Sequence, residues 1–81
     1  MRIHESAENY LETILALSKT KQFVRSIDIV NEMNFSKPSV SVAMKHLRES
    51  GHIIMDENGY ITLTDSGLEI ANNIYETFKF T

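Results

Sequence analysis

Residues 36–63 have the sequence SKPSVSVAMKHLRESGHIIMDENGYITL, in which the period of the apolar residues changes halfway. Ser36 is a good helix N-cap, and Pro38 fits the first helical turn, where its missing N–H costs no hydrogen bond. As far as Gly51, the apolar residues recur at helical spacing, at Val40, Ala43, Met44 and Leu47. The segment predicts a helix over residues 36–50 with this apolar stripe buried.

After Gly51 the apolar residues alternate with a period of two. Two short runs rich in isoleucine flank Asn58-Gly59, and this dipeptide between such runs is a strong hairpin signal, because both residues accept positive φ in a type I′ turn. We therefore expect a two-stranded hairpin over residues 52–63.

Three more helices are predicted around this segment. The first covers about residues 6–19 with Ser6 as its cap, and the second is capped by Ser26 and stops near Asn34, which tolerates the left-handed conformation. The last is capped by Thr64. The order helix, helix, helix, hairpin, helix is that of a winged helix-turn-helix, so the fold class is mainly α with a small β-hairpin.

Length and composition bound the possible functions. The chain has 81 residues with 42% hydrophobic side chains, so we treat residues 1–81 as one domain whose thin core leaves little room for a catalytic cleft. It has no cysteine, and no spacing suggests a catalytic triad or a phosphate loop. The longest apolar run is residues 14–17, far short of a membrane span. We expect a cytoplasmic binding protein, not an enzyme and without membrane contact.

Charge is segregated along the chain. The net charge of −3 hides a middle section, residues 19–48, that holds six basic residues against two acidic ones. Residues 49–81 hold one lysine against six acidic residues. A local excess of positive charge is what attracts a polyanion, so the middle section is the candidate for anion binding.

The middle section includes the predicted helix over residues 36–50. If its apolar stripe is buried, the helical period turns six residues outward: Lys37, Ser39, Ser41, Val42, Lys45 and Arg48. Hydroxyls and cations in this arrangement suit phosphates and base edges, and Val42 suits a thymine methyl group. The alternatives are an ordinary solvated helix face or a winged-helix module that binds protein. The hairpin end, Asp56-Glu57, is acidic, which argues against phosphate contact there.

Five short motifs in order carry a family resemblance: ENYLETI at residues 8–14, DIV at 28–30, SKPSV at 36–40, LRESG at 47–51 and LTDSG at 63–67. With these motifs the sequence resembles the N-terminal domain of the diphtheria-toxin-repressor family of metal-dependent regulators, especially its manganese-responsive branch. The resemblance implies a transcriptional repressor that binds double-stranded DNA. It implies that five residues occupy the family's DNA-reading positions: Ser36, Pro38, Ser39, Ser41 and Val42.

The resemblance also implies Mn(II) or Fe(II). Glu12 matches a glutamate ligand of the manganese branch, but Asn9 stands where that branch has a carboxylate, and Phe78 stands near the place of a ligand histidine. The family's dimerisation domain, with its further ligands, would follow Thr81. We therefore expect an incomplete site at Asn9 and Glu12, with no cofactor bound by this chain alone. An ordinary solvated helix face is the alternative.

The aromatic residues and the chain end give the remaining expectations. Tyr10, Phe23, Phe35 and Tyr60 are expected to pack in or against the core. Phe78 and Phe80 leave aromatic side chains at an end with little core to cover them, so we expect a homodimer formed through the first and last helices. A symmetric dimer favours a palindromic operator.

Overall fold

The computed structural model describes the backbone of residues 7–80 and the side chains of residues 7–72. It contains four helices and one antiparallel hairpin in the expected order. The elements are α1 (Ala7–Ser18), α2 (Ser26–Met33), α3 (Lys37–Glu49), β1 (Ile53–Met55), β2 (Ile61–Leu63) and α4 (Asp65–Phe80). The fold class is therefore confirmed as a winged helix-turn-helix. Over the described residues, none of these helices combines the length and the apolar character that crossing a membrane requires.

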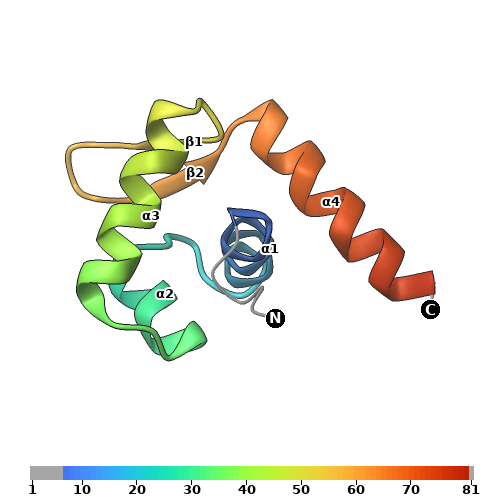
Figure 1. Cartoon of the computed structure of the whole chain (residues 1–81), viewed down its shortest axis with the longest axis horizontal. Helices are drawn as coiled ribbons and strands as arrows, with labels where there is room; N and C mark the ends of the chain where they lie inside the picture. The colour runs from blue at the N-terminus through green and yellow to red at the C-terminus, as the bar shows by residue number, and fades with distance from the viewer. Residues whose placement is uncertain (1–6, 81) are drawn as a thin grey trace.

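Helix α1 forms the centre of the domain. It contacts α2, α3, β2 and α4, and Figure 1 shows it end-on with α2 and α3 on one side and α4 on the other. Each neighbour contributes apolar side chains to one core, of which the largest fully buried members are Leu11, Ile14, Ile29, Val40 and Met44. Each such side chain stabilises the fold by about 1.5 to 3 kcal/mol. The expected cap of α1, Ser6, lies outside the described residues.

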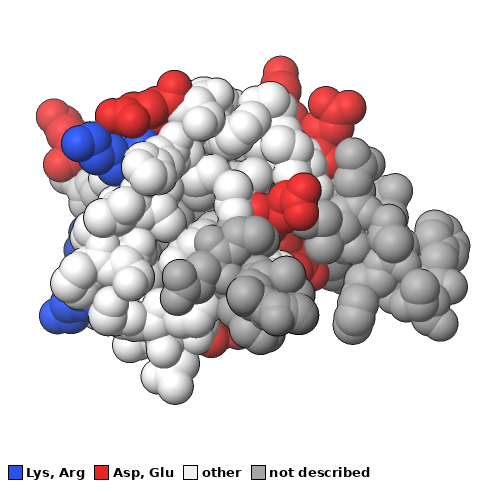
Figure 2. Space-filling view, viewed as in Figure 1, with Lys and Arg blue, Asp and Glu red and all other residues white. Residues whose placement is uncertain are grey.

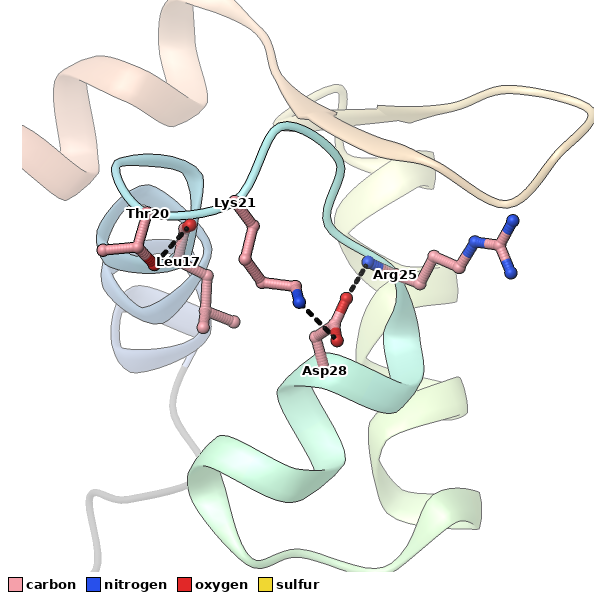
Figure 3. A network of polar contacts seen from close by, with 5 residues as sticks. All are labelled: Leu17, Thr20, Lys21, Arg25 and Asp28. Carbon is pink, nitrogen blue, oxygen red and sulfur yellow. Dashed lines mark hydrogen bonds and ion pairs between the residues drawn. The ribbon is translucent and has the colours of Figure 1, made fainter.

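The start of α2 differs from the expectation that Ser26 is its cap. Arg25 is the N-cap, with an extended backbone, and its N–H donates to the Asp28 carboxylate at 2.9 Å. The same carboxylate pairs with the Lys21 ammonium at 3.5 Å (Figure 3). An acidic residue at the third helical position reaches back to the cap more readily than a serine already inside the helix. Asn34 ends α2 in the left-handed conformation, with φ of 61°, as expected.

The hairpin turn is not the expected type I′ turn, because Asn58 has no positive φ and only Gly59, at 82°, does. The Asp56 carboxylate accepts the N–H groups of Asn58 and Tyr60, both at 2.9 Å. The Gly59 N–H donates to the Asp56 carbonyl. This side-chain capture stabilises a three-residue loop that ends on a left-handed glycine, an alternative that hairpins also use.

A third extended segment lies beside the hairpin. The strands pair in the register Ile53 with Leu63, Ile54 with Thr62 and Met55 with Ile61. On the other edge of β2, the Ile61 N–H donates to the Val24 carbonyl at 2.7 Å. Val24 is buried, so the connector before α2 is fixed to the hairpin both by its backbone and by the core.

The α3 end and the α4 start are joined through two hydroxyl groups, those of Thr64 and Ser66, which both donate to the Gly51 carbonyl. As expected, Thr64 caps α4: its Oγ1 accepts the Gly67 N–H at 3.2 Å and donates to the Gly51 carbonyl at 2.7 Å. Gly67 packs directly on the backbone of His52, where an added Cβ would overlap the His52 carbonyl oxygen and lie 3.0 Å from the carbonyl carbon. A side chain at position 67 therefore requires α4 and the hairpin to separate.

We expect the Gly67→Ala substitution to lower the free energy of unfolding by about 1 to 3 kcal/mol, the usual cost of forcing extra volume into a packed site. Urea denaturation followed by circular dichroism measures this change. Glu69→Ala, at an exposed position of the same helix, is the control and should remain within about 0.5 kcal/mol of the unsubstituted chain. Equal stability of the two variants would contradict the close contact.

Candidate nucleic-acid interface

Helix α3 begins with a hydrogen-bonded pair of serines. Ser36 is the N-cap; its Oγ accepts the Ser39 N–H at 3.3 Å and donates to the Ser39 Oγ at 3.0 Å. Pro38 follows the cap within the first turn. The local sequence therefore fixes where the helix starts and holds two hydroxyl groups at the end where its N–H groups carry partial positive charge.

The rotation of α3 is set by its apolar stripe. Val40, Met44 and Leu47 are buried, and α3 contacts α1, α2 and β1. All eight residues that the sequence proposes for DNA contact lie on the exposed side, with Val42 54% exposed. These eight residues, which we call the α3 ridge, are Ser36, Lys37, Pro38, Ser39, Ser41, Val42, Lys45 and Arg48.

Beside the ridge lies a shallow hollow of about 410 Å³. Its floor is Tyr10, which is buried and meets the Phe35 ring edge-on with the centroids 5.9 Å apart. Val42, Ala43 and His46 are among the residues around it. Ala43, expected in the buried stripe, is half-buried because it faces this hollow, and His46 is a surface residue.

The cations of the ridge have no carboxylate partner. Lys21 pairs with Asp28, whereas Lys37, Lys45 and Arg48 pair with no described carboxylate and keep their charge for an external anion. Figure 2 shows the blue side chains along the left side, where α3 and the hairpin lie in Figure 1. Red side chains lie at the hairpin and over the remainder of this view. The charges are therefore only partly separated in space, because at the upper left of Figure 2 a blue side chain lies directly against red ones.

The hairpin end is acidic, as expected, and its two carboxylates differ. Asp56 is engaged by two backbone N–H groups, whereas Glu57 is exposed. A phosphate that approached the hairpin end would meet both negative charges. The hairpin end is therefore a poor site for a phosphate contact.

Sequence reasoning missed a group at the turn end of the hairpin, beside the loop that Asp56 and Tyr60 close. Phe23 was expected in the core but is 50% exposed, and it stacks on Tyr60 with the centroids 4.3 Å apart and the planes 13° apart. The Arg25 Cζ lies over the Tyr60 ring, 4.8 Å from its centroid. The signal was the alternation in Phe23-Val24-Arg25, which is typical of a strand with only Val24 facing inward.

The residues expected at the metal site lie together on α1. Asn9 and Glu12 are half-buried and line a hollow of about 430 Å³ with Thr13, Met33 and Phe35. Together they offer one carboxylate and one amide. Within the described residues no three His, Cys, Asp or Glu side chains lie close enough to share a metal ion. This set does not fit Mn(II) or Fe(II), which need more ligands than two. The side chain of Phe78 lies outside the described residues.

A helix with an exposed polar ridge, followed by a hairpin and set on a three-helix core, defines a winged-helix domain of the kind that binds DNA. The family described as iron dependent repressor, N-terminal DNA binding domain, matches residues 2–64. The chain belongs to this family, which confirms the resemblance seen in the sequence. The family consists of transcriptional repressors, so this is a DNA-binding domain of a regulator.

A solved structure agrees with the family assignment. The structure of the manganese regulator SloR superimposes with a TM-score of 0.75 and 28% sequence identity over 86% of this chain. The chain spans about a third of the SloR chain, since the match covers 33% of it. No curated protein matches the sequence.

We expect Ser36→Ala to lower the free energy of unfolding by about 1 kcal/mol, because the start of α3 loses its capping oxygen. Ser41→Ala is the matched control, since Ser41 is exposed and accepts no backbone N–H; it should change stability by less than about 0.5 kcal/mol. Thermal and urea unfolding measure both. Equal losses would show that the Ser36 cap does not stabilise α3.

Proposed function

We propose that this domain recognises double-stranded DNA by placing α3 in the major groove, with the hairpin as the wing beside the neighbouring backbone. The observation that carries this proposal is the exposure of the whole α3 ridge, with three cations that have no carboxylate partner in the described part of the chain. Hydroxyls at the start of the helix suit phosphates and base edges. Val42 suits a thymine methyl group.

The competing proposal is a winged-helix module that binds another protein. Such a module uses the same buried stripe but has no need of unpaired cations on the outer face of α3. The two proposals differ in their response to salt, because neutralised phosphates release condensed counterions and duplex affinity then falls steeply as salt rises. Duplex binding whose affinity does not change with salt concentration, or no duplex binding at all, favours the protein-binding module.

We expect the chain to bind a fluorescently labelled duplex with an affinity that falls steeply between about 50 and 200 mM salt. Lys45→Gln should weaken binding and reduce the slope of log affinity against log salt by about one. Ser39→Ala should weaken binding by about two- to tenfold through one lost hydrogen bond. Fluorescence anisotropy measures all three.

Glu69→Gln, on the exposed side of α4, makes a charge change of the opposite sign away from the ridge and is the control. A similar slope for Lys45→Gln and the unsubstituted chain would contradict the α3 interface.

We also propose that the domain forms a homodimer. A symmetric dimer favours a palindromic operator. α1 and α4 pack against each other, and Leu68 of α4 is partly exposed. The aromatic residues Phe78 and Phe80 that suggested the dimer have side chains outside the described residues.

Light scattering tests the dimer directly. At high protein concentration we expect a mass of twice the 9.3 kDa of the chain. A mass that remains at one chain over the whole concentration range would contradict self-association through α1 and α4. It would leave the α3 interface in place.

A further inference from the structure

We propose that His46 is a further DNA-contact residue of α3, whose protonated ring binds a phosphate of the duplex, so that duplex affinity rises as the pH falls. This inference rests on the proposed function and adds a titratable contact to it. The eight residues of the α3 ridge do not include His46, although it belongs to the same helix.

The helical period places His46 near the middle of the exposed side of α3. Val42 lies opposite the buried stripe and is 54% exposed, so it marks that middle. With a step of 100° per residue, His46 lies about 40° around the helix axis from Val42, whereas Lys45 lies about 60° and Arg48 about 120° from it. His46, which is exposed, is therefore turned outward more directly than two of the cations expected to contact DNA.

A shared hollow joins His46 to the α3 ridge. The hollow of about 410 Å³ beside the ridge is lined by Pro38, Ser39 and Val42, which are ridge residues, and also by His46. A duplex that contacts Ser39 and Val42 therefore passes over the hollow that His46 lines. The backbone of that duplex brings phosphate oxygens to this surface, and phosphates receive the larger part of the hydrogen bonds in protein–DNA complexes.

The imidazole ring of His46 is available for a ligand. Within the described part of the chain, neither of its ring nitrogens forms a hydrogen bond or an ion pair. His52 differs, because its Nδ1 lies 3.1 Å from the Ser66 Oγ at the start of α4. A protonated imidazole carries two N–H donors, so protonated His46 can donate to a phosphate without breaking an existing contact.

The titratable and charged groups around His46 come from α1 and from α3 itself. Helix α1 contributes Tyr10, which is buried and forms the floor of the hollow. The other elements that contact α3, which are α2 and β1, contribute no described residue to this hollow. On α3, Lys45 precedes His46 and Glu49 follows it by about one turn. Glu49 forms no ion pair with the described residues, so the ring is not neutralised from within α3.

The sign of the pH dependence follows from the chemistry of the ring. Histidine is the side chain whose charge changes between about pH 5 and pH 8. A phosphate stabilises the protonated ring through a charge-assisted hydrogen bond, which is stronger than a hydrogen bond between neutral groups. By reciprocity, the proton then favours the duplex as much as the duplex favours the proton. Affinity is therefore higher where the ring is protonated, and it falls as the pH rises and the ring loses its proton.

The test compares duplex affinity at about pH 6 and about pH 8, on either side of the range in which histidine titrates. Fluorescence anisotropy on a labelled mixed-sequence duplex measures the affinity, with a salt titration at each pH. We expect the unsubstituted chain to bind about two- to fivefold more tightly at the lower pH, the range for one exposed charged contact. The slope of log affinity against log salt should be steeper there by up to about one.

Two substitutions of His46 represent its two charge states. His46→Gln is neutral at both pH values and should bind the duplex at both with the weaker affinity that the unsubstituted chain has at the higher pH. His46→Lys is positively charged at both and should bind at both with the tighter affinity. His52→Gln is the matched control, because His52 contacts Ser66 instead of the hollow, and it should retain the full pH dependence. Circular dichroism at both pH values confirms that each variant is folded.

The outcomes separate the His46 contact from the proposed function. If the unsubstituted chain shows salt-dependent binding that Lys45→Gln weakens, but its affinity is the same at both pH values, the His46 contact is wrong and the α3 interface stands. The contact is also wrong if His46→Gln retains the pH dependence, because another group then titrates. If the chain binds no duplex at either pH, both proposals fail together.

Discussion

The burial of Val40, Met44 and Leu47 is the constraint on which the surface of this domain depends. These side chains are held by α1, α2 and β1, so α3 cannot rotate about its axis without withdrawing them from the core. A rotation by one residue, about 100°, would bring Val42 inward and expose Val40. Which residues of α3 form the exposed ridge is therefore determined by which residues of α3 are buried.

Local rules were sufficient to predict this helix. Ser36 and Pro38 mark its start by chemistry confined to one turn, and Gly51, with φ of 82°, marks its end. The exposure of Lys45 and Ser41 followed from the period of the apolar residues alone. What these residues bind did not follow from the period, because a solvated face has the same pattern; the family resemblance supplied DNA, and the unpaired cations support it.

The predictions were wrong at two kinds of position. At one kind, the contact partner is distant in the sequence; at the other, two nearby residues could each cap the same helix or turn. Ser26 and Asp28 are both residues that cap helices, and the path of the chain beside Ile61 placed Arg25 at the cap, where Asp28 reaches it. In the hairpin, Asn58-Gly59 predicts a type I′ turn. The Asp56 carboxylate instead accepts two N–H groups and stabilises a different turn. Phe23 looked like a core residue because its partner, Tyr60, belongs to another element.

The charge of the hairpin bears on how the domain is oriented in the proposed complex with DNA. The hairpin end carries Asp56 and Glu57, and inserting it between phosphates would bring like charges together at short range. The α3 ridge, by contrast, carries three cations with no carboxylate partner among the described residues. In the proposed complex, repulsion at the hairpin end and attraction at the α3 ridge favour an approach in which the duplex contacts α3 while the acidic end faces away from the phosphates. In that complex the acidic end would contribute to the orientation of the domain without contacting a phosphate.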